Sequence, residues 1–119
     1  MILLMVTAAC VPASADDWPS WRGDNRNAVS KETGLIDSWP VGGPPIEWRA
    51  SGIGKGYSSV VVSNGLVFTT GRLDGDVYCF AIELRTGRQK WTTKIGTTAR
   101  NVMATPTVHG EFVYAVDPD

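Results

Sequence analysis

Few side chains in this sequence are of the types that carry out catalysis or bind metal ions. The chain has one histidine, His109, and two cysteines, Cys10 and Cys79. A zinc site needs several Cys or His ligands and a disulfide framework needs paired cysteines, so neither is predicted. Cys79 lies among apolar residues, which is typical of a small core side chain and not of a reactive thiolate. We therefore expect no catalytic residue and no metal ligand in this chain.

The glycine-rich segment GIGKGYSS, residues 52–59, could be mistaken for a phosphate-binding loop. Such a loop needs Gly-Lys followed directly by Ser or Thr, and it opens a helix. Here Gly56 follows Lys55, and strand-forming residues come next. The segment is predicted to be a flexible connector into a strand.

The aspartates near the expected turns are the remaining candidates for binding chemistry. They are Asp74, Asp76, Asp117 and Asp119. Calcium takes six to eight oxygen ligands, and the two carboxylates of the C-terminal Asp-Pro-Asp make a poor cage. We interpret these aspartates as turn residues.

Composition limits the function classes further. The chain has 119 residues, 43% of them hydrophobic and 19% charged, with a net charge of -1. This length and composition suit one folded domain, and no basic excess is present to bind nucleic acid. Many glycines and tryptophans, 13 and 5 respectively, favour short strands joined by turns.

The N-terminus resembles a secretory signal peptide over residues 1–15. Its uncharged apolar run is too short to span a bilayer and ends in Ala13-Ser14-Ala15, the small-x-small pattern of a cleavage site. The protein is therefore expected to be periplasmic or secreted, without a transmembrane helix. Lipidation at Cys10 is a disfavoured alternative, because Thr7 stands where a lipobox prefers Leu.

Residues 16–47 show no lasting period of 2 or 3.6 and are rich in Trp, Pro and Gly. They are predicted to form an irregular N-terminal arm. Because large rings bury well only against another surface, we expect its tryptophans to fix the arm to a larger body.

The pattern becomes regular from residue 58 onward. Asn64-Gly65, Asp74-Gly75 and Thr86-Gly87 are turn signals between β-rich runs. They predict four antiparallel strands at about 58–63, 66–72, 76–83 and 88–95.

The inner predicted strands are apolar on both faces, whereas the fourth alternates between apolar and polar residues. This indicates one blade of a β-propeller, with the edge of a β-sandwich as the alternative. We expect both faces of the sheet to stay wet unless neighbouring blades cover them.

The sequence also repeats internally. A shift of 46 residues places SSVVVSNGLVF (58–68) on ATPTVHGEFVY (104–114), and Trp48 and Trp91 are 43 residues apart. Such a period is close to the ~40–50 residues of four-stranded blades. Trp48 is accordingly predicted to lie on the outer strand of a preceding sheet.

The segment AIELRTGRQKW, residues 81–91, resembles the pyrroloquinoline-quinone-type (PQQ-like) repeat, with consensus Ala-Leu-Asp-x-x-Thr-Gly-x-x-x-Trp. The patterned positions are Ala81, Ile82, Glu83, Thr86, Gly87 and Trp91. Residues 105–119 resemble the start of a next repeat, and residues 17–40 resemble the leader of exported bacterial propeller proteins. The resemblance implies an all-β fold. After the irregular arm, residues 48–119 would form the start of a β-propeller, with one four-stranded blade and parts of two others.

In this family the Trp packs flat beside a Gly of a neighbouring motif, so Ala81, Thr86, Gly87 and Trp91 are expected to be structural. Some members are quinoprotein dehydrogenases of alcohols or sugars, with a quinone and calcium. Others are non-catalytic scaffolds of the cell envelope. We expect the second class, with the remaining blades of a longer chain and envelope proteins as partners. There are two alternatives. One is the N-terminal part of a dehydrogenase, in which only the full-length protein would bind PQQ and calcium. The other is a nonfunctional truncated fragment.

Overall fold

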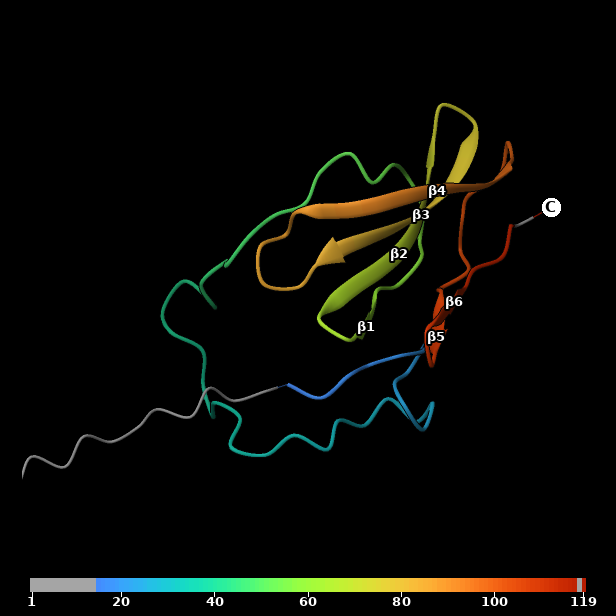
Figure 1. Ribbon diagram of the computed structural model, residues 1–119. Coiled ribbons are helices and arrows are strands. Elements are labelled where there is room, and N and C mark those ends of the chain that lie inside the picture. The colour runs from blue at the N-terminus through green and yellow to red at the C-terminus, as the bar shows by residue number, and fades with distance from the viewer. Residues whose placement is uncertain (1–14, 118) are drawn as a thin grey trace, which may run out of the picture.

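The computed structural model describes residues 15–117 and 119. The predicted signal peptide, apart from Ala15, lies outside the described residues, and so does Cys10. The described part is all-β and contains no helix (Figure 1). A four-stranded antiparallel sheet has the order β1-β2-β3-β4, and a separate antiparallel hairpin follows it. The strands are β1 Val61–Ser63, β2 Leu66–Leu73, β3 Asp76–Glu83, β4 Gln89–Thr97, β5 Thr107–His109 and β6 Phe112–Tyr114. The predicted four-stranded antiparallel sheet is confirmed.

Local turn chemistry determines where the strands of this sheet reverse. Asn64 and Gly65 have φ of 51° and 73°, and Asp74 and Gly75 have φ of 51° and 93°. Two-residue hairpins need positive φ at both positions, which Asn-Gly and Asp-Gly adopt at low cost. Gly87 supplies the positive φ, 68°, of the β3–β4 turn. All three predicted turns are therefore confirmed.

The largest differences from the predicted strand ends are at the start of β1 and the end of β4. β1 begins at Val61 and not at residue 58, because Ser59 donates its N–H to the Thr105 hydroxyl at 3.0 Å instead of joining the ladder to β2. β4 continues to Thr97, where that residue is still paired with Asp76.

One face of the sheet is covered by the β5–β6 hairpin. Neighbouring strands place one residue each in a row across this face: Val61, Phe68, Ala81 and Trp91. Val108 and Val113 of the hairpin pack against the row, together with Leu66. This is the main hydrophobic cluster of the described residues.

The chain that precedes β1 lies along the end of β2. Lys55 pairs with Arg72 at the edge of this strand through two backbone hydrogen bonds of 2.9 Å, and the Ile53 carbonyl lies against Gly71 on the opposite face. Apolar side chains on this face, such as Phe80 and Ile82, are buried. On the first face the cover is the hairpin, which lies in the predicted next repeat, so burial there agrees with the expectation. On the opposite face Phe80 and Ile82 are buried without a further sheet of the described residues, so the expectation of a wet face is wrong there. The connector is also hydrogen-bonded to the sheet, whereas a flexible one was expected.

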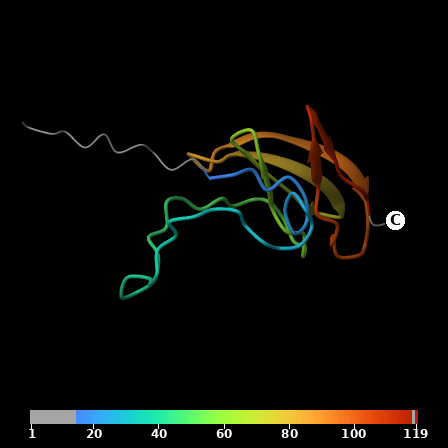
Figure 2. The same cartoon turned by 90° about the horizontal axis from the view of Figure 1, so that it is seen from below.

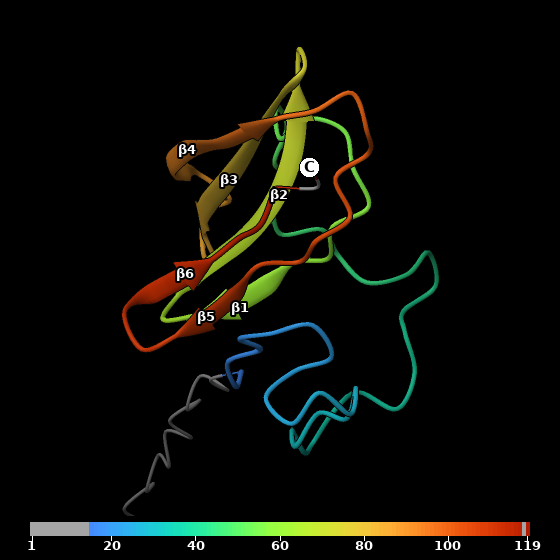
Figure 3. The ribbon, with the colours of Figure 1, turned by 90° about the vertical axis from the view of Figure 1, so that its right-hand side faces the viewer.

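The start of the arm joins the edges of the two sheets. Trp18 and Val62 exchange backbone hydrogen bonds of 2.8 and 2.9 Å, and the Val108 N–H donates to the Pro19 carbonyl at 2.7 Å. In Figure 3 this segment lies beside β1 and β5. The arm thereby protects the edge of β1, which would otherwise expose unpaired backbone groups.

The rest of the arm runs away from the sheets (Figure 2). Trp21 and Trp39 are 54% and 65% exposed, so the prediction that the arm's tryptophans fix it to a larger body is wrong for these two. The Trp21 ring instead has the Arg22 guanidinium above it, 4.2 Å from its centroid. The arm is held by its first few residues, where backbone pairing is available.

The second hairpin repeats the first with the predicted shift. β5 begins at Thr107 and β6 at Phe112, each 46 residues after the start of β1 and β2. The Ser59–Thr105 hydrogen bond joins two positions that are themselves related by this shift. The recurrence therefore exists in the fold as well as in the sequence.

Candidate functional site

Ala81 lies at the centre of the row that runs across the sheet. It is fully buried, with Phe68 opposite it on β2 and Trp91 opposite it on β4. The rings of Phe68 and Trp91 approach to 5.8 Å between centroids at an angle of 48°, a tilted arrangement favourable for aromatic pairs. A side chain larger than a methyl group would separate the two rings. The motif therefore needs a small residue at this position.

The β3–β4 turn is held together by the carboxylate of Glu83. Thr86 donates its hydroxyl to Glu83 Oε2 at 2.8 Å, and the Arg88 guanidinium contacts Glu83 Oε1 at 2.8 Å. The Gly87 N–H donates to the Glu83 carbonyl at 2.9 Å, and the Arg88 N–H donates to the Thr86 hydroxyl at 3.2 Å. These bonds give the acid and the threonine of the motif a structural role.

This network also changes the acidity of Glu83. Hydrogen bonds from Arg88 and then from Thr86 favour the charged carboxylate and lower the pKa of Glu83 below its usual value, against a smaller opposing effect of desolvation. Glu83 therefore stays ionised as a fixed acceptor at neutral pH, which is the opposite of what a general acid needs.

Trp48 lies on the turn that Glu83 holds. Three atoms of its ring lie 2.6–2.9 Å from where a Cβ on Gly87 would stand, so the ring rests flat on the glycine. The indole N–H donates to the Leu84 carbonyl at 2.8 Å. Only glycine leaves room for a ring at this distance.

The prediction that Trp48 lies on the outer strand of another sheet is wrong for the described residues. A strand needs a hydrogen-bonding neighbour, and no described residue pairs with the backbone of residues 46–50. The ring contact to Gly87 replaces strand pairing as the constraint on this segment.

The fold brings the predicted motif residues together in two groups. Ala81 and Trp91 face each other across β3 and β4, whereas Thr86 and Gly87 form the turn beneath Trp48. Trp91 contacts Phe68 and no glycine turn within the described residues. Sequence reasoning missed Trp48 as the ring on Gly87, although its 43-residue spacing to Trp91 was the available signal.

The candidate ligand residues are dispersed or already paired. Asp76 contacts Lys94 at 2.8 Å, and this contact is the first cause of a pKa of Asp76 below its usual value. Asp117 packs on Gly96, while Asp119 lies 3.6 Å from Arg100. Among residues 15–117 and 119, no group of three or more His, Cys, Asp or Glu is placed to hold a metal ion. These donors do not fit a calcium cage.

Cys79 is 3% exposed on β3, where desolvation raises the pKa of its thiol. A raised pKa keeps the sulfur protonated at neutral pH, so it is a poor nucleophile. The prediction of a small core residue is confirmed.

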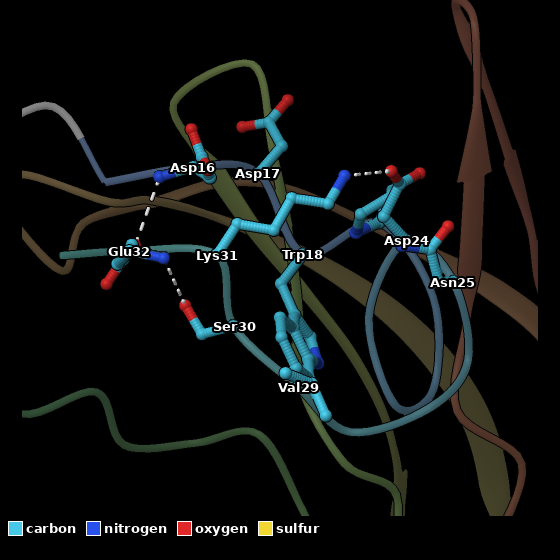
Figure 4. A pocket seen from close by; sticks show the side chains of 10 residues that line it. Asp16, Asp17, Trp18, Asp24, Asn25, Val29, Ser30, Lys31 and Glu32 are labelled. Atoms are coloured by element: carbon cyan, nitrogen blue, oxygen red, sulfur yellow. Dashed lines mark hydrogen bonds and ion pairs between the residues drawn. The ribbon is translucent and has the colours of Figure 1, made fainter.

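A hollow on the arm collects several charged groups (Figure 4). It is bounded by Trp18 and Val29, and Lys31 there contacts Asp24 at 3.4 Å. Both members of that pair are well exposed, so the contact contributes little to stability.

No family model, curated protein or solved structure matches this chain. In the part of the chain that the structure describes, there is no helix of the length and hydrophobicity that crossing a membrane would require. The sites described above therefore carry the functional argument by themselves.

Proposed function

We propose that this chain is a PQQ-like β-propeller repeat module of an exported bacterial protein, serving as a non-catalytic scaffold or binding protein in the cell envelope. On this proposal β1–β4 form one blade and the β5–β6 hairpin begins the next. A propeller closes its ring with 4–8 blades, so further repeats of the same kind complete it.

The contact between Trp48 and Gly87 carries the proposal. Trp48 stands one repeat before Trp91, and its ring rests on the Thr-Gly turn of the motif that ends in Trp91. The resemblance implies this relation between neighbouring repeats. If the same relation holds for the next pair of repeats, Trp91 rests on the Thr-Gly turn of a further repeat.

The hairpin recurrence supports the same arrangement independently. β5 and β6 repeat β1 and β2 after 46 residues and pack on one face of the first sheet. Stacked units that each cover the face of the one before are typical of repeat architectures.

The non-catalytic reading is supported by what the motif residues do. Ala81 leaves room for two rings to approach each other, Glu83 and Thr86 fix a turn, and Gly87 receives a ring. Each role is structural. The described donors do not fit calcium, so no step is assigned to a quinone or a metal.

The test is an activity assay on the full-length protein. Pyrroloquinoline quinone and calcium are added together with an artificial electron-accepting dye and a panel of primary alcohols and sugars. The proposal expects no dye reduction above a sample without quinone, and no rise in melting temperature with both additions. Substrate-dependent dye reduction that needs quinone would overturn it in favour of a dehydrogenase.

A further inference from the structure

The hydrogen bonds that hold the start of the described chain begin at Asp16. The Asp16 backbone nitrogen lies 3.1 Å from Glu32 Oε1 (Figure 4). The next residue, Asp17, accepts from the Ser63 hydroxyl at 3.0 Å and from the Asn64 N–H at 3.1 Å. Trp18 then pairs with β1. Residues 15–17 themselves are exposed.

The sequence places a cleavage pattern at the same point. Ala13-Ser14-Ala15 has the small-x-small form that signal peptidases accept, and the bond that follows joins Ala15 to Asp16. We propose that the Ala15–Asp16 bond is hydrolysed during export and that Glu32 binds the new α-ammonium group of Asp16. This inference rests on the exported location proposed above, and not on the propeller assignment.

The chemistry of the step is ordinary amide hydrolysis. The bond between the Ala15 carbonyl carbon and the Asp16 nitrogen breaks. Water supplies a hydroxyl group to the carbonyl carbon and a proton to the nitrogen. At neutral pH the products are the Ala15 carboxylate and the Asp16 ammonium. Where the chain now presents one amide N–H to Glu32, the cleaved chain presents three donors and a positive charge.

The charged groups around Asp16 favour this exchange. The Asp17 carboxylate already accepts hydrogen bonds from the β1–β2 turn, and Lys31 lies against Asp24. Glu32 is therefore the carboxylate that meets the nitrogen of Asp16 directly. Cleavage breaks none of the described hydrogen bonds and converts one of them into an ion pair.

The first arm of the test is cleavage of the 119-residue chain. The 119-residue protein is incubated with a bacterial signal peptidase in detergent micelles, and the product is measured by intact mass. We expect a single new N-terminus at Asp16, and no product from the Ala15→Phe variant, because a large side chain does not fit a site for small residues. Cleavage at another bond, or none, would overturn the proposal.

The second arm titrates the α-amine of the cleaved product by NMR. Because exposed ion pairs are weak, Glu32→Gln should lower the pKa of this amine by about half a unit relative to the unsubstituted product. Glu111→Gln, an exposed substitution in the β5–β6 turn, is the matched control and should leave it unchanged. Equal values in the two variants would refute the role of Glu32. Neither arm depends on the dye-reduction result, so the two proposals fail separately.

Discussion

Replacing Trp48 by alanine tests the contact on which the proposed repeat architecture depends. The ring is half-buried, rests on Gly87 and donates to the Leu84 carbonyl at 2.8 Å. The substitution removes both interactions and leaves the Thr-Gly turn intact. We expect a clear loss of stability with little change in secondary structure.

The size of the loss follows from the area involved. A half-buried tryptophan removes about 150 Å² from water, worth at most about 4 kcal/mol at ~25 cal/mol/Å². The indole hydrogen bond adds about 1 kcal/mol, and the unfolded chain already buries part of the ring. We therefore expect Trp48→Ala to lower the free energy of unfolding by about 2–4 kcal/mol. For a domain of this size that is a fall in Tm of about 8–16 °C.

Thermal and denaturant melts of three variants give the measurement. Trp39→Ala removes an exposed ring and should change the unfolding free energy by no more than about 0.5 kcal/mol. Trp48→Phe keeps a ring but loses the indole N–H, so it should cost about 1 kcal/mol. If Trp48→Ala melts like Trp39→Ala, the ring contact does not stabilise the fold and the argument fails.

A double-mutant cycle isolates the contact itself. A methyl group at Gly87 would overlap the Trp48 ring, and the φ of +68° adds backbone strain. Gly87→Ala should therefore cost more in the native background than in the Trp48→Ala background, where only the strain is left. Equal costs in both backgrounds would show that the ring does not rest on the glycine in solution.

Three further predictions concern the sheet. Trp91→Ala should lower the unfolding free energy by about 2–4 kcal/mol, because it removes the partner of Phe68, while any binding activity per folded molecule stays unchanged; the check is a melt beside an assay normalised to folded protein. The pKa of Glu83 is lowered in the folded state, so the ionised carboxylate stabilises the fold. This stabilisation should be fully present above the ordinary glutamate pKa of about 4.3 and should be lost as pH falls through the lower folded value. Tm measured against pH should therefore fall less steeply in this range in Glu83→Gln than in the unsubstituted protein. Cys79 should react with iodoacetamide much more slowly in the native protein than in guanidinium chloride, followed by peptide mass spectrometry; equal rates would contradict its burial and raised pKa.

The turns and the order of the strands could be predicted from the sequence because both depend on short stretches of chain. Asn64-Gly65 and Asp74-Gly75 adopt positive φ in almost any context, and the strands between them are read from their β-branched and aromatic residues. The burial of β3, which is apolar on both faces, and the exposure of the alternating β4 could be predicted in the same way. The burial of Thr69 and Thr70 on β2 could not, because it depends on what packs against the sheet.

The motif residues could be named from the sequence, but their contacts could not. The resemblance to the PQQ-like repeat picked out Ala81 and Trp91, yet it did not show that Phe68 completes the ring pair. The 43-residue spacing placed Trp48 on a strand, because a repeated spacing gives an equivalent position without giving its neighbours. A strand forms only where another strand is present to pair with it.

The sequence by itself determined an all-β chain with three tight turns, a four-stranded antiparallel sheet and a 46-residue recurrence. Only the tertiary structure decided that the second hairpin covers one face of the sheet, that the connector pairs with the edge of β2, that Trp18 pairs with β1, and that the Trp48 ring rests on Gly87. The physical reason is range. Turn conformation and strand preference are set by residues a few positions apart, whereas these contacts join segments that are distant along the chain and compete for the same apolar surface.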